Sequence, residues 1–317
     1  MMMSRALVCC AVALLLEGCW LAPKQGVTPL FESPSFGDDF WARWGDGKAE
    51  LASYELTHPR YGSPRRGTAL TIFVTERFDP MQRVKSDSGE GVSVMKLNLV
   101  EDFATGIYDY NLMTSAFVTL EPALGRPAGS PYKIAFSGQE WCGQTWEQWL
   151  FDRAVIRRTA HSYFDGEADE SEEIAIHPKG VAEDALWHWA RGFSGPALEP
   201  GGTIDLRMLP SMQRLREIHE GPGWVAATLS RSGTPSTVEV PAGTFEVETY
   251  SVSTPGFTRT FFVERAEPRR IIRWETSEGE SADLIADDRL EYWKMNGPEF
   301  DAAVEKLGLS PRPPRTM

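Results

Sequence analysis

The segment Ser137–Trp146, with sequence SGQEWCGQTW, contains the only cysteine beyond the first nineteen residues. A cysteine acts as a nucleophile when a neighbouring base or positive charge stabilises its thiolate. Cysteine before histidine is the order of papain-like hydrolases, and Gln139 could donate to an oxyanion. The candidate bases downstream are His161, His177, His188 and His219. A cysteine hydrolase using Cys142 is therefore one candidate function.

An unreactive Cys142 is the alternative that the neighbouring residues favour. Glu140 and Glu147 make the surroundings negative, which is the opposite of what lowers a thiol pKa. The local residues lack the papain pattern, and transglutaminase-like elements are not evident. Free cysteine is also among the most buried residue types. We predict that Cys142 is buried in a strand in the middle of a sheet, that it is only a weak catalytic candidate, and that the protein is not an enzyme.

Metal and cofactor sites are not indicated by the sequence. His219 and Glu217 would share one face of an expected strand, but one histidine and one acid are not a coordination set. The acidic run Asp165–Glu173 lacks the spacing of a calcium loop and predicts a solvated loop. No phosphate-binding loop, dinucleotide fingerprint or G-x-S-x-G element is present. We therefore expect no metal and no cofactor.

The tryptophans are the best candidates for ligand contacts. The chain has 11 of them, and a groove lined by indole rings could hold a sugar or a lipid. The same rings could instead fill the thick core of a curved sheet. The candidate ligand-binding residues are Trp141, Trp146, Trp149, Trp187 and Trp189, with Trp224 as a further aromatic residue of this kind.

The charge of the chain excludes one class of partner. The net charge is −13, with 45 acidic and 32 basic residues. Nucleic-acid binding needs clustered Lys and Arg to neutralise phosphates. We therefore expect no nucleic-acid partner and no direct attraction to anionic lipid head groups.

The first residues predict export. Met1–Arg5 is a short basic region, and Ala6–Leu16 is an apolar run too short to span a bilayer as a helix. The following Leu16–Cys19 is typical of a lipoprotein signal, with Cys19 as the lipidated N-terminus, although Glu17 is unusual there. Ordinary signal cleavage is the alternative. Trp20 in place of Asp favours transfer to the outer membrane, so we predict an outer-membrane lipoprotein of the cell envelope, facing the periplasm or the exterior.

Composition divides the rest of the chain. We predict a signal peptide over residues 1–18, a lipidated N-terminus and flexible tether over 19–38, and a disordered tail over 309–317. Residues 39–308 are then a single β-rich domain, with a possible subdivision near 165–200. With Cys9, Cys10 and Cys19 accounted for, Cys142 has no partner for an internal disulfide.

The body of the chain reads as successive strands. Alternating apolar and polar residues predict strands over Lys48–Thr57, Thr68–Phe78, Val92–Val100, Tyr108–Leu120, two or three within Pro131–Phe164, and more from Thr203 to Trp293. Short helices are predicted over Gly180–Gly192 and Gly297–Gly308. The fold class is therefore mainly β: one large curved antiparallel sheet or half-open barrel with a few short helices.

Two family resemblances extend this interpretation. Asp46–Glu76, Met113–Phe117 and SGQEWCGQTW together resemble a family of uncharacterised bacterial envelope lipoproteins. Val238–Glu275 is similar to a second periplasmic family, of unknown function, with a curved sheet. Both resemblances imply an exported, curved-sheet protein, and neither implies catalytic residues. Ser63–Arg66 matches the S-x-R-R element of septum-formation-inhibitor nucleotide pyrophosphatases, but the rest of that enzyme pattern is missing and we reject the assignment.

The sequence thus predicts a non-catalytic binding or carrier module that is attached to a membrane by its lipid anchor. Its partner would be an apolar small molecule held in the concave face of the sheet. A structural or interaction subunit of the outer membrane, contacting another protein, is the alternative.

Overall fold

The computed structural model describes residues 32–311, and the first half of this range is a run of consecutive hairpins. Alternating burial along each strand reflects the alternating sequence pattern, with apolar side chains on one face and polar ones on the other. The strands are β1 (Ala49–Arg60), β2 (Ser63–Phe78), β3 (Val92–Thr105), β4 (Tyr108–Thr119), β5 (Pro131–Glu140), β6 (Gly143–Phe151), β7 (Val155–Ser162) and β8 (Asp169–Ala175).

The second half of the described range continues the same sheet. Its strands are β9 (Gly180–Ala182), β10 (Thr203–Leu209), β11 (Val225–Arg231), β12 (Ser236–Val240), β13 (Gly243–Thr254), β14 (Phe257–Glu264), β15 (Ile271–Thr276) and β16 (Ser281–Leu290). β16 pairs antiparallel with β1, which joins the two halves through strands that are far apart in sequence.

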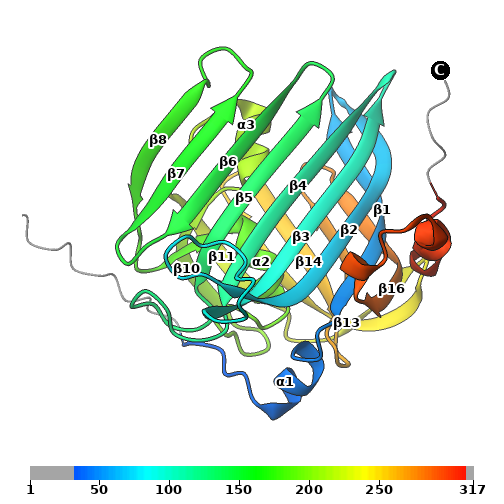
Figure 1. The fold of residues 1–317 in the computed structure, drawn as a ribbon, viewed down its shortest axis with the longest axis horizontal. Coiled ribbons are helices and arrows are strands. Elements are labelled where there is room, and N and C mark those ends of the chain that lie inside the picture. The colour runs from blue at the N-terminus through cyan, green and yellow to red at the C-terminus, as the bar shows by residue number, and fades with distance from the viewer. Residues whose placement is uncertain (1–31, 312–317) are drawn as a thin grey trace, which may run out of the picture.

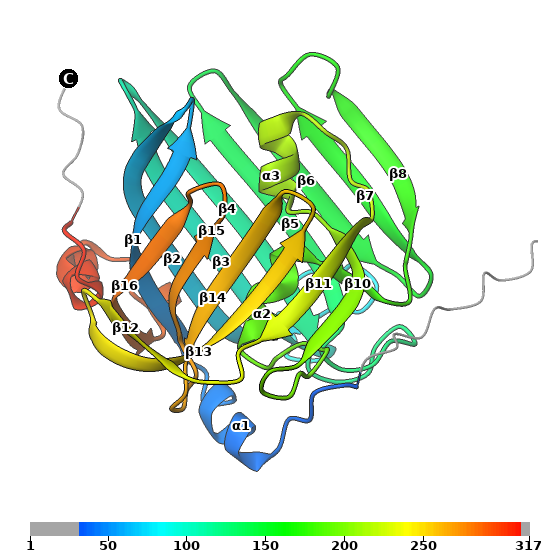
Figure 2. The same ribbon diagram turned by 180° about the vertical axis from the view of Figure 1, so that it is seen from behind.

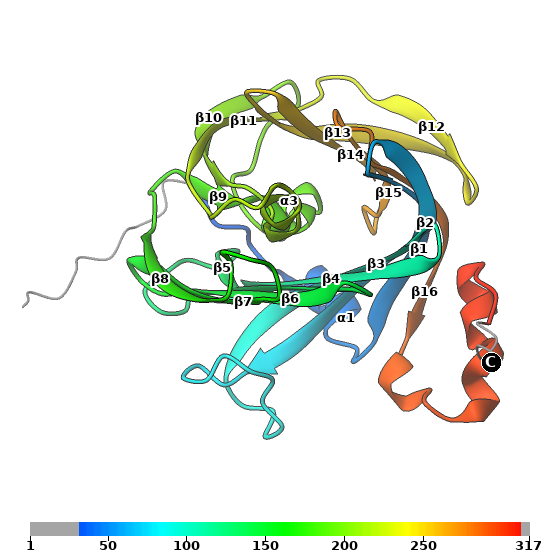
Figure 3. The ribbon, with the colours of Figure 1, turned by 90° about the horizontal axis from the view of Figure 1, so that it is seen from above.

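All these strands form one 16-stranded sheet. The order is β8-β7-β6-β5-β4-β3-β2-β1-β16-β15-β14-β13-β11-β10-β9, with β12 paired to β13 beside this path. The pairs are antiparallel except for β9 with β10. Seen from above, the sheet curls into an open C and does not close into a barrel (Figures 1 and 3). The predicted fold class is confirmed, because a sheet of this length must curl to cover its apolar face.

The helices are short. They are α1 (Asp38–Trp44), α2 (Leu186–Ala190) and α3 (Met212–Ile218), with 3-10 segments η1 (Glu183–Ala185), η2 (Tyr292–Lys294) and η3 (Pro298–Leu307). The helix expected over Gly180–Gly192 is only partly correct, since its first residues form β9 and its middle forms η1. A strand was expected around His219, but this segment is helical. Glu217 lies within α3, and His219 is its left-handed C-cap. Figure 2 shows α2 and α3 against the concave side of the sheet.

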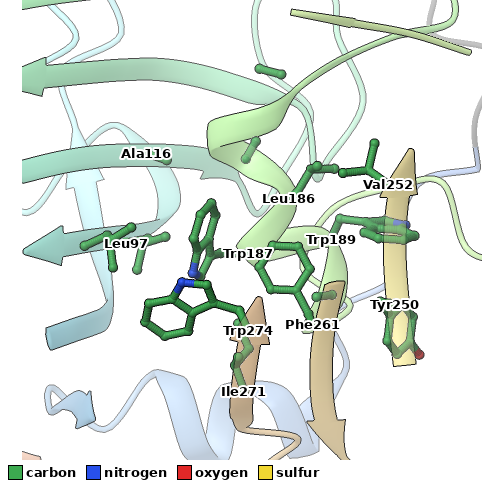
Figure 4. Packing of buried hydrophobic residues seen from close by; sticks show 14 of the residues in the cluster. Leu97, Ala116, Leu186, Trp187, Trp189, Tyr250, Val252, Phe261, Ile271 and Trp274 are labelled. Carbon is green, nitrogen blue, oxygen red and sulfur yellow. The ribbon is translucent and has the colours of Figure 1, made fainter. Parts of the chain in front are cut away.

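The concave face of the sheet is filled by side chains. Trp187 of α2 packs edge-on against Phe261 of β14 and Trp274 of β15, with ring centroids 5.1 and 6.2 Å apart. Trp189 packs edge-on against Tyr250 of β13 (Figure 4). Each edge-to-face pair contributes about 0.5–1.5 kcal/mol beyond the area it buries. α2 is therefore the central element of the core between the two halves of the sheet.

Two further expectations have structural outcomes. The acidic run Asp165–Glu173 was expected to be a loop, but from Asp169 onward it belongs to strand β8. This strand pairs with β7 at the edge of the sheet, and most of its carboxylates are exposed. Leu309, expected in a disordered tail, packs against a small apolar cluster that contains Leu307. The signal peptide, Cys19 and the start of the tether lie outside the described residues. No helix within residues 32–311 is long and apolar enough to cross a membrane.

Candidate functional site

The segment SGQEWCGQTW forms the tip of the hairpin between β5 and β6. Glu140 pairs with Gly143 and Gln139 pairs with Gln144, which leaves Trp141 and Cys142 as the two turn residues. The prediction that this segment lies in the middle of the sheet is therefore wrong. Alternation alone could not decide it, because a two-residue turn interrupts the strand pattern without a glycine or proline in the turn itself.

The register of this hairpin gathers polar and aromatic side chains on the convex face of the sheet. Ile134 and Trp149 are an inward-facing pair in the core, so by alternation Ser137, paired to Trp146, points outward. Gln139 and Gln144 form the next outward pair toward the tip. These two outward pairs therefore form one solvent-facing surface of the segment.

Trp146 is held in place by its neighbour across the sheet. It pairs with His161 of β7, whose ring stacks on the indole with centroids 5.6 Å apart and planes 22° from parallel. His161 Nδ1 donates to Asp169 Oδ1 on β8 at 2.6 Å. Asp169 is also the cross-strand partner of His161. A side-chain row, Ser137–Trp146–His161–Asp169, thus runs across four strands and fixes the orientation of the indole.

An open groove of about 670 Å³ runs along this row and the hairpin tips. We call it the hairpin groove. Trp141 and Tyr163, which flank it, are 61% and 70% exposed. The ring of Tyr163 lies over Gly143, where an added Cβ would come within 2.4 Å of it. The lining residues are Ser137, Gln139, Glu140, Trp141, Gly143, Gln144, Thr145, Trp146, His161, Ser162, Tyr163 and Asp169.

The tryptophans predicted as ligand contacts divide into two groups. Trp141 and Trp146 line the hairpin groove. Trp149, Trp187 and Trp189 are at most 3% exposed and belong to the core. Trp189 also borders a cavity of only about 50 Å³. The structure therefore brings only two of the five candidates together at one cleft, and the core explanation holds for the other three.

Trp224, the further aromatic candidate, is half-buried away from the groove. Its indole nitrogen donates to the carbonyl of Ala175 at 2.9 Å. This bond joins the start of β11 to the end of β8, so Trp224 has a structural contact of its own.

Cys142 is exposed in the turn, so the prediction that it is buried is also wrong. Exposure alone does not make a nucleophile. His161, the histidine on the neighbouring hairpin, is hydrogen-bonded to Asp169 and lies opposite Trp146, four residues along the strand from Cys142. That separation is about 13 Å at the rise of a β-strand, which is beyond hydrogen-bond reach.

On the concave side of the same hairpins lies a smaller polar cleft next to α3, with a volume of about 140 Å³. Arg158 donates from Nε to Glu147 at 2.7 Å and from Nη1 to Glu170 and Glu172. His219 pairs with Glu167. The ion pairs of Arg158 thus join β7 to β6 and β8, and the pair of His219 with Glu167 links the C-cap of α3 to the loop between β7 and β8, so these charged groups have structural partners.

A buried charge cluster near α2 was not expected from the sequence. Arg259 of β14 donates to Glu183 of η1 at 3.2 Å and to Glu280, in the turn after β15, at 3.0 Å. Glu280 also accepts from the indole nitrogen of Trp274 at 2.6 Å. Burial would raise the pKa of Glu280, but the charge of Arg259 holds it below its ordinary value. Alternation could have placed Arg259 inward between Phe257 and Phe261, although an inward arginine needs partners that no local pattern reveals.

Glu101 of β3 faces the same interior. Burial, with a smaller contribution from the charge of Glu280, raises the pKa of Glu101 to about 7. His58 donates to Glu217 of α3 over 3.0 Å. Burial would lower the pKa of His58, but the hydrogen bond with Glu217 raises it. Leu97, Leu99 and Glu101 alternate along β3, so this pattern alone would have predicted that Glu101 lies on the apolar face of the sheet.

Metal binding has no support in the described residues. No group of three or more His, Cys, Asp or Glu side chains between residues 32 and 311 is arranged to hold an ion. His188 is fully buried with Nε2 3.1 Å from the carbonyl of Met95, and burial lowers its pKa to about 3. His188 is thus a neutral core residue.

Comparison with protein-family models, with curated proteins and with solved structures finds no match to this chain. The candidate site therefore rests on its own geometry. That geometry combines fixed aromatic rings, exposed amides and an open groove, and it brings no nucleophile and base together.

Proposed function

We propose that this chain is a non-catalytic binding module of the cell envelope, and that its ligand binds in the hairpin groove. The observation that carries the proposal is the row Ser137–Trp146–His161–Asp169, which holds an exposed indole in one orientation beside two amides. Exposed aromatic rings with a few fixed polar groups are typical of ligand sites. A ring that is already oriented loses little conformational entropy when a ligand contacts it.

The outer face is favoured over the concave face for this role. The concave face is occupied by α2 and its tryptophans. The cavities next to Trp189 and Tyr110 hold about 50 and 20 Å³, and the polar cleft next to α3 holds about 140 Å³. Drug-sized ligands occupy pockets of roughly 300–1,000 Å³, which is the range of the hairpin groove. We therefore move the proposed ligand from the concave face, where the sequence placed it, to the convex face.

Export and lipid anchoring at Cys19 remain part of the proposal. They are supported by the apolar run Ala6–Leu16 and by the small residue before Cys19. An anchored chain would present the groove to the envelope compartment in which it resides.

Ligand capture tests the proposal. The processed protein would be immobilised and exposed to aqueous and organic extracts of the envelope, and the retained molecules would be identified by mass spectrometry. We expect the native protein to retain a molecule that the double variant Trp141→Ala/Trp146→Ala loses. Trp293→Ala is the matched control, because Trp293 is 41% exposed and lies in η2, outside the groove. Equal retention by the native protein and the double variant would overturn the proposal.

An interaction subunit is the second candidate, and a different observation favours it. β1 to β8 are consecutive antiparallel neighbours, so the turns of alternate hairpins lie at one rim of the sheet, the upper edge in Figure 1. Each of the four turns carries a large exposed side chain: Tyr61, Ile107, Trp141 and Tyr163, which are 60%, 85%, 61% and 70% exposed. Such a rim is suited to contact with another protein. Ile107→Asp separates the two candidates, because Ile107 lies outside the groove: it would abolish a rim contact and leave a groove ligand bound.

A further inference from the structure

We infer that the hairpin groove and the polar rows beside it bind a neutral carbohydrate, a chain of pyranose rings without charged substituents. This inference rests on the proposed function and names its ligand class. A pyranose ring has an apolar C–H face and an edge of hydroxyl groups. Its site therefore needs a flat aromatic ring and, next to it, side chains that both donate and accept hydrogen bonds.

Trp146 supplies the flat ring. Its indole is covered by the imidazole of His161 on the β7 side. On the β5 side its cross-strand neighbour is Ser137, one of the smallest polar residues, which leaves room above the sheet. Trp146 is 37% exposed and borders the groove. A sugar ring can therefore lie on the indole without displacing a protein side chain.

Two rows made mostly of uncharged polar residues flank the tryptophan row, and the one nearer the tip ends on β3 at Asp102, which accepts from Asn111. Toward the tip, Asn111, Gln139 and Gln144 are successive cross-strand neighbours on β4, β5 and β6. On the other side, the outward residues from β3 to β8 are Asn98, Ser115, Ala135, Gln148, Thr159 and Ser171. Successive outward rows are about 7 Å apart along a strand. The outer face thus alternates amides and hydroxyls with one central aromatic row, and both group types can donate and accept.

The charges near the groove select against other ligands. The outward ionisable acid that lines it is Asp169, and its histidine is already hydrogen-bonded to Asp169, so the groove offers no unengaged cation to an anionic chain. The other acid at the tip, Glu140, points to the concave side by alternation and pairs there with Arg216 of α3. A purely apolar ligand would cover the amide rows without satisfying their hydrogen bonds, which costs about 1–3 kcal/mol for each buried group. A neutral polyhydroxylated chain avoids both costs.

Isothermal titration of the full processed protein with defined sugars tests this inference. The neutral probes are cellohexaose, chitohexaose and maltohexaose. The contrasting probes are an anionic hexagalacturonate and a fatty acid. A sedimentation assay with an insoluble neutral glycan (cellulose or chitin) forms a second arm, which distinguishes a polymer surface from a free oligosaccharide as the source of the same chemistry. The variants are Trp146→Ala, Trp146→Phe and Gln144→Ala, with Trp293→Ala as the control.

We expect saturable binding of at least one neutral hexasaccharide or of the insoluble glycan. Trp146→Ala should weaken it at least tenfold, Trp146→Phe should weaken it less, and Trp293→Ala should leave it unchanged. Gln144→Ala, an exposed substitution that spares the core, should also weaken it several-fold. The inference is overturned if no neutral glycan binds, if all variants bind alike, or if the anionic or apolar probe binds the groove in preference. If the groove retains some other molecule in the capture experiment, the proposed function stands and the carbohydrate inference fails.

Discussion

The imidazole of His161 stacks on the indole of Trp146 at a centroid distance of 5.6 Å, and this contact organises the convex face of the sheet. His161 is itself oriented by Asp169 at 2.6 Å. Trp146, His161 and Asp169 thus form an aromatic platform. They come from the neighbouring strands β6, β7 and β8, each of which contributes one side chain to the same row. The positions of these three side chains are set by the register of β6, β7 and β8 and not by the loops around them.

Removing the orienting carboxylate tests the platform without touching the groove aromatics. Asp169→Ala should weaken retention of the groove ligand several-fold, because the imidazole that supports Trp146 loses its fixed orientation. The free energy of unfolding should change by less than about 1 kcal/mol, since exposed ion pairs contribute little. Asp283→Ala is the control, because Asp283 pairs with the half-buried Arg273 on the other half of the sheet. Equal effects of both variants on ligand retention would contradict the assigned role.

The exposure of Cys142 is directly measurable. A folded protein with this thiol in a hairpin turn should react rapidly with a colorimetric thiol reagent at neutral pH. Cys142→Ser should remove that reaction and leave binding and stability unchanged. Labelling that occurs only after unfolding would show that the turn residue is buried, as the sequence alone had suggested.

The core tryptophans should differ from the groove tryptophans in what they contribute to stability. Trp187→Ala should lower the free energy of unfolding by about 3–5 kcal/mol, because it removes a ring packed against Phe261 and Trp274. Trp141→Ala, at an exposed turn, should lower it by less than about 1 kcal/mol. Urea denaturation of both variants checks this. Similar losses would mean that the two rings are in equivalent environments.

The buried arginine should be essential for the fold. Arg259→Met leaves the buried carboxylate of Glu280 without its cation and leaves Glu183 with only Arg214, 3.7 Å away, and breaking a buried pair in this way costs about 3–5 kcal/mol. Arg273→Met, at a partly exposed pair with Asp283, should cost less than about 1 kcal/mol. Chemical denaturation of the two variants checks this, and equal losses of unfolding free energy would contradict the buried position of Arg259.

Stability should fall as the pH rises from about 4.5 to 7. Burial raises the folded-state pKa of Glu101 to about 7, and burial also raises that of Asp184 to about 7. An acid with a raised pKa stabilises the fold fully below its unfolded pKa, and that contribution is lost as the pH passes through the folded value. Glu101→Gln should therefore reduce the loss by about 2–3 kcal/mol, measured as the free energy of unfolding at pH 4.5 and pH 7.5. A pH dependence identical to that of the native protein would contradict the assigned environment of Glu101.

The sequence predicted the sheet well because strand alternation is a local signal. Leu97, Leu99 and Phe103 alternate along β3, and the strands from β1 to β7 follow from such runs. Long-range pairing is not local: nothing in the sequence indicates that β16 returns to pair with β1, or that Arg259 meets Glu183. The sequence predicted that tryptophans contribute to the candidate site, but it could not distinguish the exposed Trp141 and Trp146 from the buried Trp149. That distinction depends on where the turn between β5 and β6 lies.

The local sequence pattern failed to predict the secondary structure of the acidic strand β8 and of the helix α3. The residues of β8 are mostly charged and lack an apolar face, so only pairing with β7 makes them a strand. Glu217 and His219 alternate as in a strand, yet their backbone is helical up to the C-cap at His219. In both segments tertiary contacts overrode the local pattern.

Hydrogen–deuterium exchange with and without the captured envelope ligand locates the binding site on the folded chain. A ligand in the hairpin groove should slow amide exchange only at the tips of β5, β6 and β7, around Gln139, Gln144 and His161, with no change at α2. Protection centred on Trp187 and Trp189 in the interior, or none at the β5–β6 tip, would contradict a binding site in the hairpin groove.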